Sequence, residues 1–195
     1  MKFVHPRRGP WRTVAGDDGP LVSITPQPHL LLTPAEWHAV RGHWPQGMPV
    51  GVRLANDVEV AALADDLPRL ALIALDFPKW TDGRAYSQAR LLRSRLRYTG
   101  ELRATGEVLA DMLPMLARTG FDAVVLRADQ RQDVAERALG YFGGHYQGDT
   151  RDPLPLFAKP QGSADAAARA SVPSASRQER LHECNRALRA GDAGL

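Results

Sequence analysis

Residues 50–142 alternate regularly between short apolar runs and amphipathic stretches, and this alternation limits the possible folds more than any other feature. Four short segments are predicted as strands: Val50–Leu54, 70–75, 101–104 and 123–126, of which 72–75 is an unbroken apolar run typical of a buried strand. An amphipathic stretch with helical spacing follows each of them. A β-α order of this kind favours a parallel sheet with right-handed crossovers. We therefore predict an α/β fold with about four to five parallel strands.

Four or five strands are too few to close an eight-stranded barrel. An open doubly wound sheet and a partial barrel, similar to half of a TIM barrel, both remain as arrangements. The chain is predicted to contain three parts: an irregular β arm with a short helix over 1–49, the α/β core over 50–157, and a low-complexity tail, disordered or helical, over 158–195.

Local signals refine this outline. Within the arm, strands are predicted at 21–24 and Leu30–Leu32, and Thr33-Pro34 with Glu36 is a helix start with a capping box. In the core, Asn56 with Glu59 has the same capping pattern and predicts a helix there. Pro114 is expected to kink the third helix. A core-facing stripe is predicted on the second helix at Ala85, Ala89, Leu92 and Leu96.

Composition and missing motifs exclude several classes of protein. The net charge is only +3 and no long run of like charge occurs, so no nucleic-acid partner is expected. Cys184 is the single cysteine, which rules out an internal disulfide and a four-cysteine cluster. No dinucleotide or phosphate-loop motif is present, and His38 and His43 are five residues apart, so we expect neither cofactor nor metal. With no secretory signal or membrane span in the sequence, a cytoplasmic protein is expected.

The loop after the second predicted strand is the first candidate site. Over Asp76 to Arg84 it holds two carboxylates, two cations and two aromatic rings, more than capping requires. In a parallel sheet, ligands bind beyond the carboxyl ends of the strands. Asp76 and Asp82 are therefore candidate catalytic bases, a role that would need a pKa raised by burial.

Cations near other strand ends are expected to converge on the same rim. Lys79 and Arg84 come from this loop, Arg103 lies in the third strand, and Arg127 follows the fourth. Together with the positive ends of the helices they favour binding of a small oxyanion, or of a phosphorylated or sulfonated ligand. The alternative is that these charges only form caps and ion pairs at the rim.

A second stripe on the helix after this loop is predicted either to face solvent or to bind an acidic partner protein. Its members are Tyr86, Arg90, Arg93 and Arg97.

Two runs of the core are similar to a known family. DFPKWTDGRAYSQARLLR (76–93) and GELRATGEVLADMLPMLARTGFDAVVL (100–126) resemble the bacterial domain-of-unknown-function 934 family. Trp80 stands where the family often has Phe, and Ala85 where Gly is common. Family members are typically encoded beside an assimilatory sulfite reductase, and some are described as oxidoreductases involved in sulfite reduction. The resemblance gives no catalytic residues to carry over.

Three hypotheses follow for function. The resemblance implies an accessory protein of sulfur assimilation that acts with sulfite reductase or its electron donor. The charged rim instead favours a small α/β enzyme acting on an anionic metabolite. The third possibility is a structural partner without catalysis, for which a homodimer is the expected state, because a partial barrel leaves apolar edges.

Overall fold

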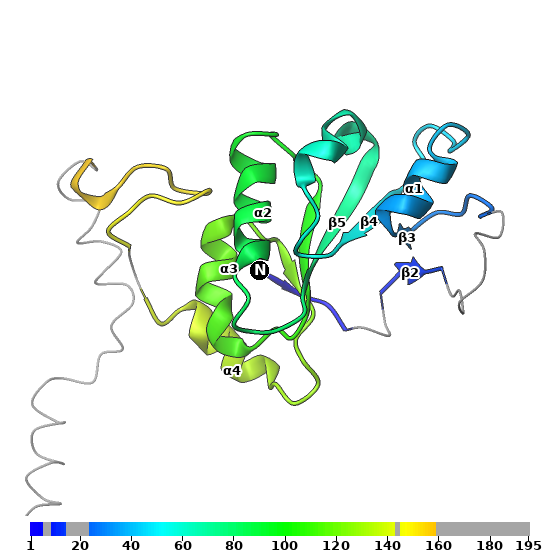
Figure 1. Cartoon of the computed structure of the whole chain (residues 1–195). Helices are drawn as coiled ribbons and strands as arrows, with labels where there is room; N and C mark the ends of the chain where they lie inside the picture. Colours follow the sequence, from blue (N-terminus) through cyan, green and yellow to red (C-terminus); the bar gives the residue numbers. More distant parts are fainter. Residues whose placement is uncertain (6–8, 15–23, 143–144, 159–195) are drawn as a thin grey trace, which may run out of the picture.

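The computed structural model describes residues 1–5, 9–14, 24–142 and 145–158. The predicted tail from residue 159 onward therefore lies outside the described residues. The same holds for residues 21–23 of the predicted strand at 21–24. Within the described part, the chain forms one α/β unit built on a single sheet (Figure 1).

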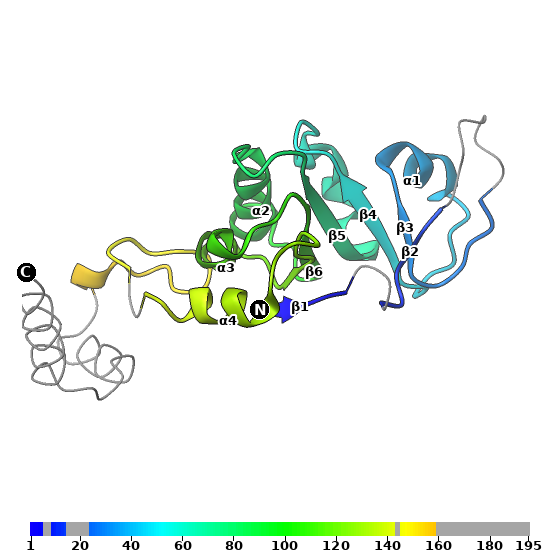
Figure 2. The same ribbon diagram turned by 90° about the horizontal axis from the view of Figure 1, so that it is seen from below.

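The sheet has seven strands, and every neighbouring pair is parallel. Its order is β1-β7-β6-β5-β4-β3-β2. It curls into an open half-barrel, so the predicted class and the partial-barrel arrangement are confirmed (Figure 2). The strands are β1 (Lys2–Phe3), β2 (Arg12–Thr13), β3 (Leu30–Leu32), β4 (Val50–Leu54), β5 (Leu70–Phe77), β6 (Glu101–Gly106) and β7 (Ala123–Val124).

The predicted strand count of four to five was too low because the N-terminal arm adds three strands to the sheet. β3 pairs with β4 in register from Leu30 opposite Val50. β1 and β2 contribute only two residues each and occupy the two opposite edges of the sheet. Strands this short have no sequence periodicity of their own and form only because a neighbouring strand offers hydrogen bonds.

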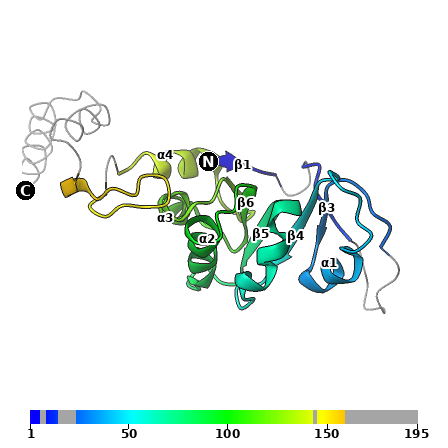
Figure 3. The same cartoon turned by 90° about the horizontal axis from the view of Figure 1, so that it is seen from above.

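Helices cover one face of the sheet (Figure 3). Alternate strand residues, among them Val52, Ile73, Leu75 and Leu102, point to this face and are fully buried. Trp37, Phe77 and Phe121 are the largest fully buried side chains in this core. The helical elements are α1 (Pro34–Val40), η1 (Val60–Arg69), α2 (Arg84–Ser94), η2 (Ala110–Met112), α3 (Leu113–Thr119), α4 (Gln132–Leu139) and η3 (Leu156–Ala158), where η marks a 3-10 helix.

Two of the predicted local features are confirmed. Thr33 caps α1: its hydroxyl accepts a hydrogen bond from the Glu36 amide, and the Glu36 carboxylate accepts one of 2.6 Å from the Thr33 amide. On α2 the residues Ala85, Ala89 and Leu92 are fully buried and Leu96, just beyond the helix, is half-buried, as the stripe predicts.

Two other local predictions were wrong. Asn56 does not cap a helix: the chain makes a turn there, and a 3-10 helix begins only at Val60. The turn is held from outside, because Gln88 of α2 donates hydrogen bonds to the carbonyls of Ala55 and Val58. Pro114 does not kink a helix, because it lies in the first turn of α3, where the missing N–H has no intrahelical partner to lose.

Candidate functional site

The face of the sheet turned away from the helices carries a row of cations. In register across five strands lie Arg53 (β4), Ala74 (β5), Arg103 (β6), Ala123 (β7) and Lys2 (β1). Three cations thus alternate with two alanines along one line. Strands lie about 4.8 Å apart, so Arg53 and Arg103 are separated by roughly 10 Å at the backbone. We call this set the basic row.

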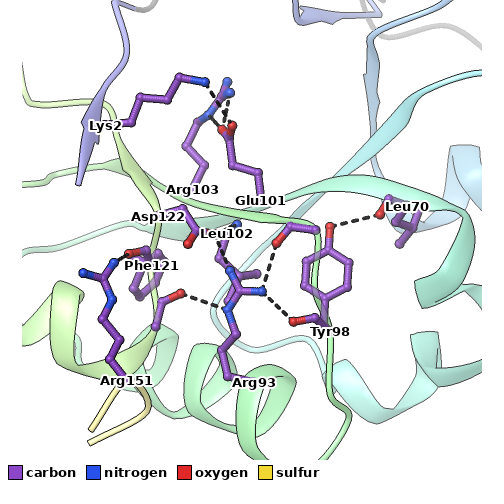
Figure 4. Close-up of polar contacts among 12 residues, drawn as sticks. Lys2, Leu70, Arg93, Tyr98, Glu101, Leu102, Arg103, Phe121, Asp122 and Arg151 are labelled. Carbon is purple, nitrogen blue, oxygen red and sulfur yellow. Dashed lines mark hydrogen bonds and ion pairs between the residues drawn. The ribbon is translucent and has the colours of Figure 1, made fainter.

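Two carboxylates pair with the basic row, one on each side of it. Asp76 binds Arg53 at 3.1 Å and also accepts a hydrogen bond of 3.0 Å from Thr105, its neighbour on β6. Glu101 accepts a bond of 2.8 Å from Nε of Arg103, and Lys2 lies 3.6 Å from it. Figure 4 shows Lys2, Arg103 and Glu101 gathered above the strand. Arg103 is the most buried of these charges, at 7% exposure.

Described residues of the N-terminal arm lie over the same face. They belong to the connection between β1 and β2, the strands at the opposite edges of the sheet. We call residues 4–5 and 9–11 the strap. Its described residues Val4, His5, Gly9 and Trp11 line a cavity together with the basic row.

This strap cavity has a volume of about 280 Å³. That is close to the lower end of the size range of small-molecule sites, which begins at about 300 Å³. It opens at the carboxyl ends of β4, β5 and β6, the place where parallel α/β folds bind ligands. Its lining consists of Val4, His5, Gly9, Trp11, Thr13, Leu31, Arg53, Asp76, Arg103, Thr105, Gly106 and Val125.

Trp11 anchors the strap to the sheet at a glycine. A Cβ built on Gly51 would come within 2.9 Å of the Trp11 ring and 3.1 Å of Leu31. The absence of a side chain at Gly51 therefore makes room for the indole. The ring also makes an edge-to-face contact with His29, with 5.2 Å between the centroids.

The structure separates the loop residues that the sequence placed together. Asp76 enters the strap cavity, whereas Lys79, Asp82 and Arg84 do not line it. Asp82 and Arg84 form an ion pair of 2.8 Å, and the Arg84 amide also donates to the Asp82 carboxylate. These bonds from Arg84 lower the pKa of Asp82 to about 2, opposite to the shift that a catalytic base requires. Lys79 is exposed.

Arg103 and Arg127 also lie apart. Arg103 faces the strap cavity, whereas Arg127 lines a second cavity of about 530 Å³ beside β1 and β7. Its guanidinium is held by Asp129 and Glu107, at 2.6 and 2.8 Å, and these bonds raise the pKa of Arg127. These two ion pairs of Arg127 agree with the alternative hypothesis that the charges near the strand ends only form caps and ion pairs at the rim of the sheet.

The predicted partner stripe does not form one exposed surface. Arg90 and Arg97 are exposed, and Tyr86 is half-buried against the ring of Phe77. Arg93 points into the molecule and donates hydrogen bonds to the carbonyls of Gly100 and Gly120 and to the carboxylate of Asp122 (Figure 4). Its position next to Arg90 and Arg97 on a helical plot gave no sign of this structural role.

Sequence reasoning missed three contributors to the cavity face, namely Lys2, Trp11 and Glu101. A signal existed for Arg53 and Arg103, because each is a lone cation between apolar residues of a strand, in Val52-Arg53-Leu54 and Leu102-Arg103-Ala104. A charge at such a position must lie on the face opposite the core. No comparable signal marks Trp11, whose site depends on the fold.

The part of the chain that the structure describes contains neither a cluster of metal ligands nor a membrane-spanning helix. Its His, Cys, Asp and Glu residues form no group of three or more that could hold a metal ion. None of the helices within these ranges is long and apolar enough to cross a membrane.

Comparison with known proteins gives one match. The model of a family described as bacterial protein of unknown function (DUF934) matches residues 51–157, more than half of the chain. The chain belongs to this family. The DUF934 match begins in β4 and includes Arg53, Asp76 and Arg103, but the strap and β3 precede it. No curated protein and no solved structure matches the chain.

Proposed function

We propose that this protein is an accessory protein of assimilatory sulfite reduction, that it acts with sulfite reductase or its electron donor, and that it binds an oxyanion in the strap cavity. The sulfite-reduction role is supported by the resemblance of residues 76–93 and 100–126 to proteins typically encoded beside a sulfite reductase. The anion is supported by the basic row.

The burial of Arg103 carries the anion part of the proposal. A guanidinium is costly to bury unless it is paired, and Glu101 satisfies the edge that carries Nε. Among the described residues of this face, Lys2, Arg53 and Arg103 stand against the carboxylates of Asp76 and Glu101, and an anion bound at the lining arginines would balance the excess positive charge. Arginine also binds oxyanions through two parallel hydrogen bonds.

Isothermal titration of the full chain with sulfite, sulfate and phosphate tests this site. We expect Arg53→Gln and Arg103→Gln each to weaken binding at least tenfold, the loss typical of a hydrogen bond to a charged group. Arg84→Gln is the matched control, because Arg84 forms a similar arginine–aspartate pair outside the cavity. Equal loss in the control variant, or no binding by the parent chain, would contradict the proposal.

A deletion strain tests the biological role separately. Without this protein, growth on sulfate should be impaired and growth on cysteine should be normal. Co-purification of the tagged chain with sulfite reductase or its electron donor is the second expected result. Unimpaired growth on sulfate together with no recovered partner would exclude the role.

Asp76 supports a second candidate function, an enzyme acting on an anionic metabolite. It is the carboxylate among the residues lining the strap cavity, at the carboxyl end of β5. A general base needs to lie within reach of a bound ligand, and among the two candidate bases Asp76 meets this condition. Asp76→Asn should then abolish turnover of a substrate and leave its binding largely intact, whereas Asp82→Asn should change neither.

A further inference from the structure

The lining of the strap cavity has a charged side and an apolar side, and the two come from different parts of the chain. The charged groups Arg53, Asp76 and Arg103 lie within the family match at 51–157. The large apolar groups Trp11 and Leu31 precede it. The charged side is thus part of the family region, and the large apolar groups are supplied by the N-terminal arm, with Val125 added from the family region.

The apolar side is held in place by packing. Trp11 and Leu31 lie together over Gly51, where a Cβ would approach the indole to 2.9 Å and Leu31 to 3.1 Å. His29 supports the indole from its edge. Both side chains are only half-buried, so part of each surface remains free to contact a ligand.

The cavity is also larger than a bare oxyanion needs. Its volume of about 280 Å³ corresponds to the space of roughly nine water molecules, at about 30 Å³ each. A sulfur atom with three or four oxygens would occupy only the part next to the arginines. The remaining volume borders Trp11, Leu31 and Val125; the side chains of Leu31 and Val125 offer no hydrogen bond, and that of Trp11 offers only the indole N–H.

We infer that the ligand of the strap cavity is a small organic anion, a sulfonate, carboxylate or phosphate ester, with an apolar body of a few carbons. Its charged group lies against Arg53 and Arg103, and its body packs against Trp11 and Leu31. This inference rests on the proposed anion site and names the class of compound that fills it. Trp11 is then a specificity-determining residue, and it acts through contact with the part of the ligand that carries no charge.

The test compares two sulfonates whose alkyl chains differ in length, with sulfate as a reference anion that has no carbon chain. Sulfate, methanesulfonate and propane-1-sulfonate are titrated into the full chain. Each buried methylene should tighten binding about fourfold, so propane-1-sulfonate should bind roughly 15-fold tighter than methanesulfonate. Trp11→Ala should remove most of this gain and leave methanesulfonate affinity nearly unchanged. Trp80→Ala, which removes an exposed ring outside the cavity, is the control.

The outcomes separate this inference from the anion site itself. If sulfate binds and propane-1-sulfonate binds no tighter than methanesulfonate, the organic ligand is excluded while the anion site stands. If no anion binds, the anion site and the inference both fail. Because Trp11→Ala could detach the strap, Leu31→Ala serves as a second variant on the stable strand β3, and it should reduce the propane-1-sulfonate gain several-fold. An unchanged gain in Leu31→Ala and in Trp11→Ala would overturn the inference.

Discussion

Arg93 of α2 binds the carboxylate of Asp122, and through this pair one helical side chain joins the start of two strands. The same Asp122 oxygen accepts the amide of Leu102 at the beginning of β6 at 2.9 Å. Arg93 also donates to the carbonyls of Gly120 and Gly100, at 3.0 and 2.9 Å. The guanidinium thus satisfies backbone groups that helix and sheet leave without partners.

Replacing Arg93 should therefore destabilise the fold. Its side chain is 16% exposed, and its loss would remove the donor to the carbonyls of Tyr98, Gly100 and Gly120 and the cation paired with Asp122. We expect Arg93→Ala to lower the free energy of unfolding by about 2–4 kcal/mol, measured by urea denaturation. Arg90→Ala, on the exposed side of the same helix, should change it by less than about 0.5 kcal/mol. Similar values for the two variants would refute the structural role of Arg93.

The fold was predictable because its signal is repeated. Each strand from β4 to β7 is followed by a helical element or turn, so an error at Asn56 did not alter the β-α order. The edges of the sheet were not predictable. β1 and β2 are two residues long, and β1 pairs with the distant strand β7, so that only the folded chain defines them.

The site was predictable in part, for an electrostatic reason. Charges crowded into a loop reach each other easily, and Asp82 with Arg84, two residues apart, form a local pair. Arg103 likewise pairs with Glu101, two residues away on the same strand, whereas Arg53 pairs with Asp76 of the neighbouring strand β5. The loop after β5 supplies Asp76 to the strap cavity and the strands supply Arg53 and Arg103, so both sequence signals bear on the candidate site.

Gly106, at the end of β6, should not tolerate a side chain. Its φ is 92°, and a Cβ would come within 2.4 Å of the Phe77 carbonyl oxygen on β5. We expect Gly106→Ala to cost about 2–4 kcal/mol, from the left-handed backbone and the clash together. Gly47 has a φ of 79° with no atom within 4 Å, so Gly47→Ala should cost only about 1–2 kcal/mol. Thermal or urea unfolding of the pair measures the clash as the difference, and an equal cost in both would show that β5 moves aside.

Tyr86 should make the protein lose stability at alkaline pH. Burial raises its pKa from 10.0 to about 12, with a smaller contribution from Asp111. In this pH interval the unfolded chain releases the phenol proton and the folded chain keeps it, so stability is fully present below about pH 10 and falls toward pH 12. Urea midpoints measured from pH 8 to 12 should fall less steeply for Tyr86→Phe than for the parent chain. Parallel curves would mean that Tyr86 ionises equally in the two states.

Gly51 should control the position of the strap. A methyl group there meets three neighbours at once, at 2.9 Å in Trp11 and 3.1 Å in Leu31 and Leu72. Leu72 belongs to the central strand β5 and Leu31 to a paired strand, so Trp11 has the most freedom to move. In Gly51→Ala, we expect the Trp11 indole to leave its site and become exposed to solvent.

Fluorine NMR of chains labelled with fluorotryptophan checks this directly, since Trp11→Phe assigns the Trp11 signal among the four tryptophans. In Gly51→Ala the Trp11 signal should move toward the solvent-exposed position, while those of the buried Trp37 and Trp44 stay in place. Gly42→Ala is the matched control, because its Cβ would contact nothing within 4 Å. If Trp11 does not shift, the strap is held by contacts other than the one with Gly51. If all signals shift, the substitution disturbs the sheet itself, and the anchoring role of Gly51 is refuted.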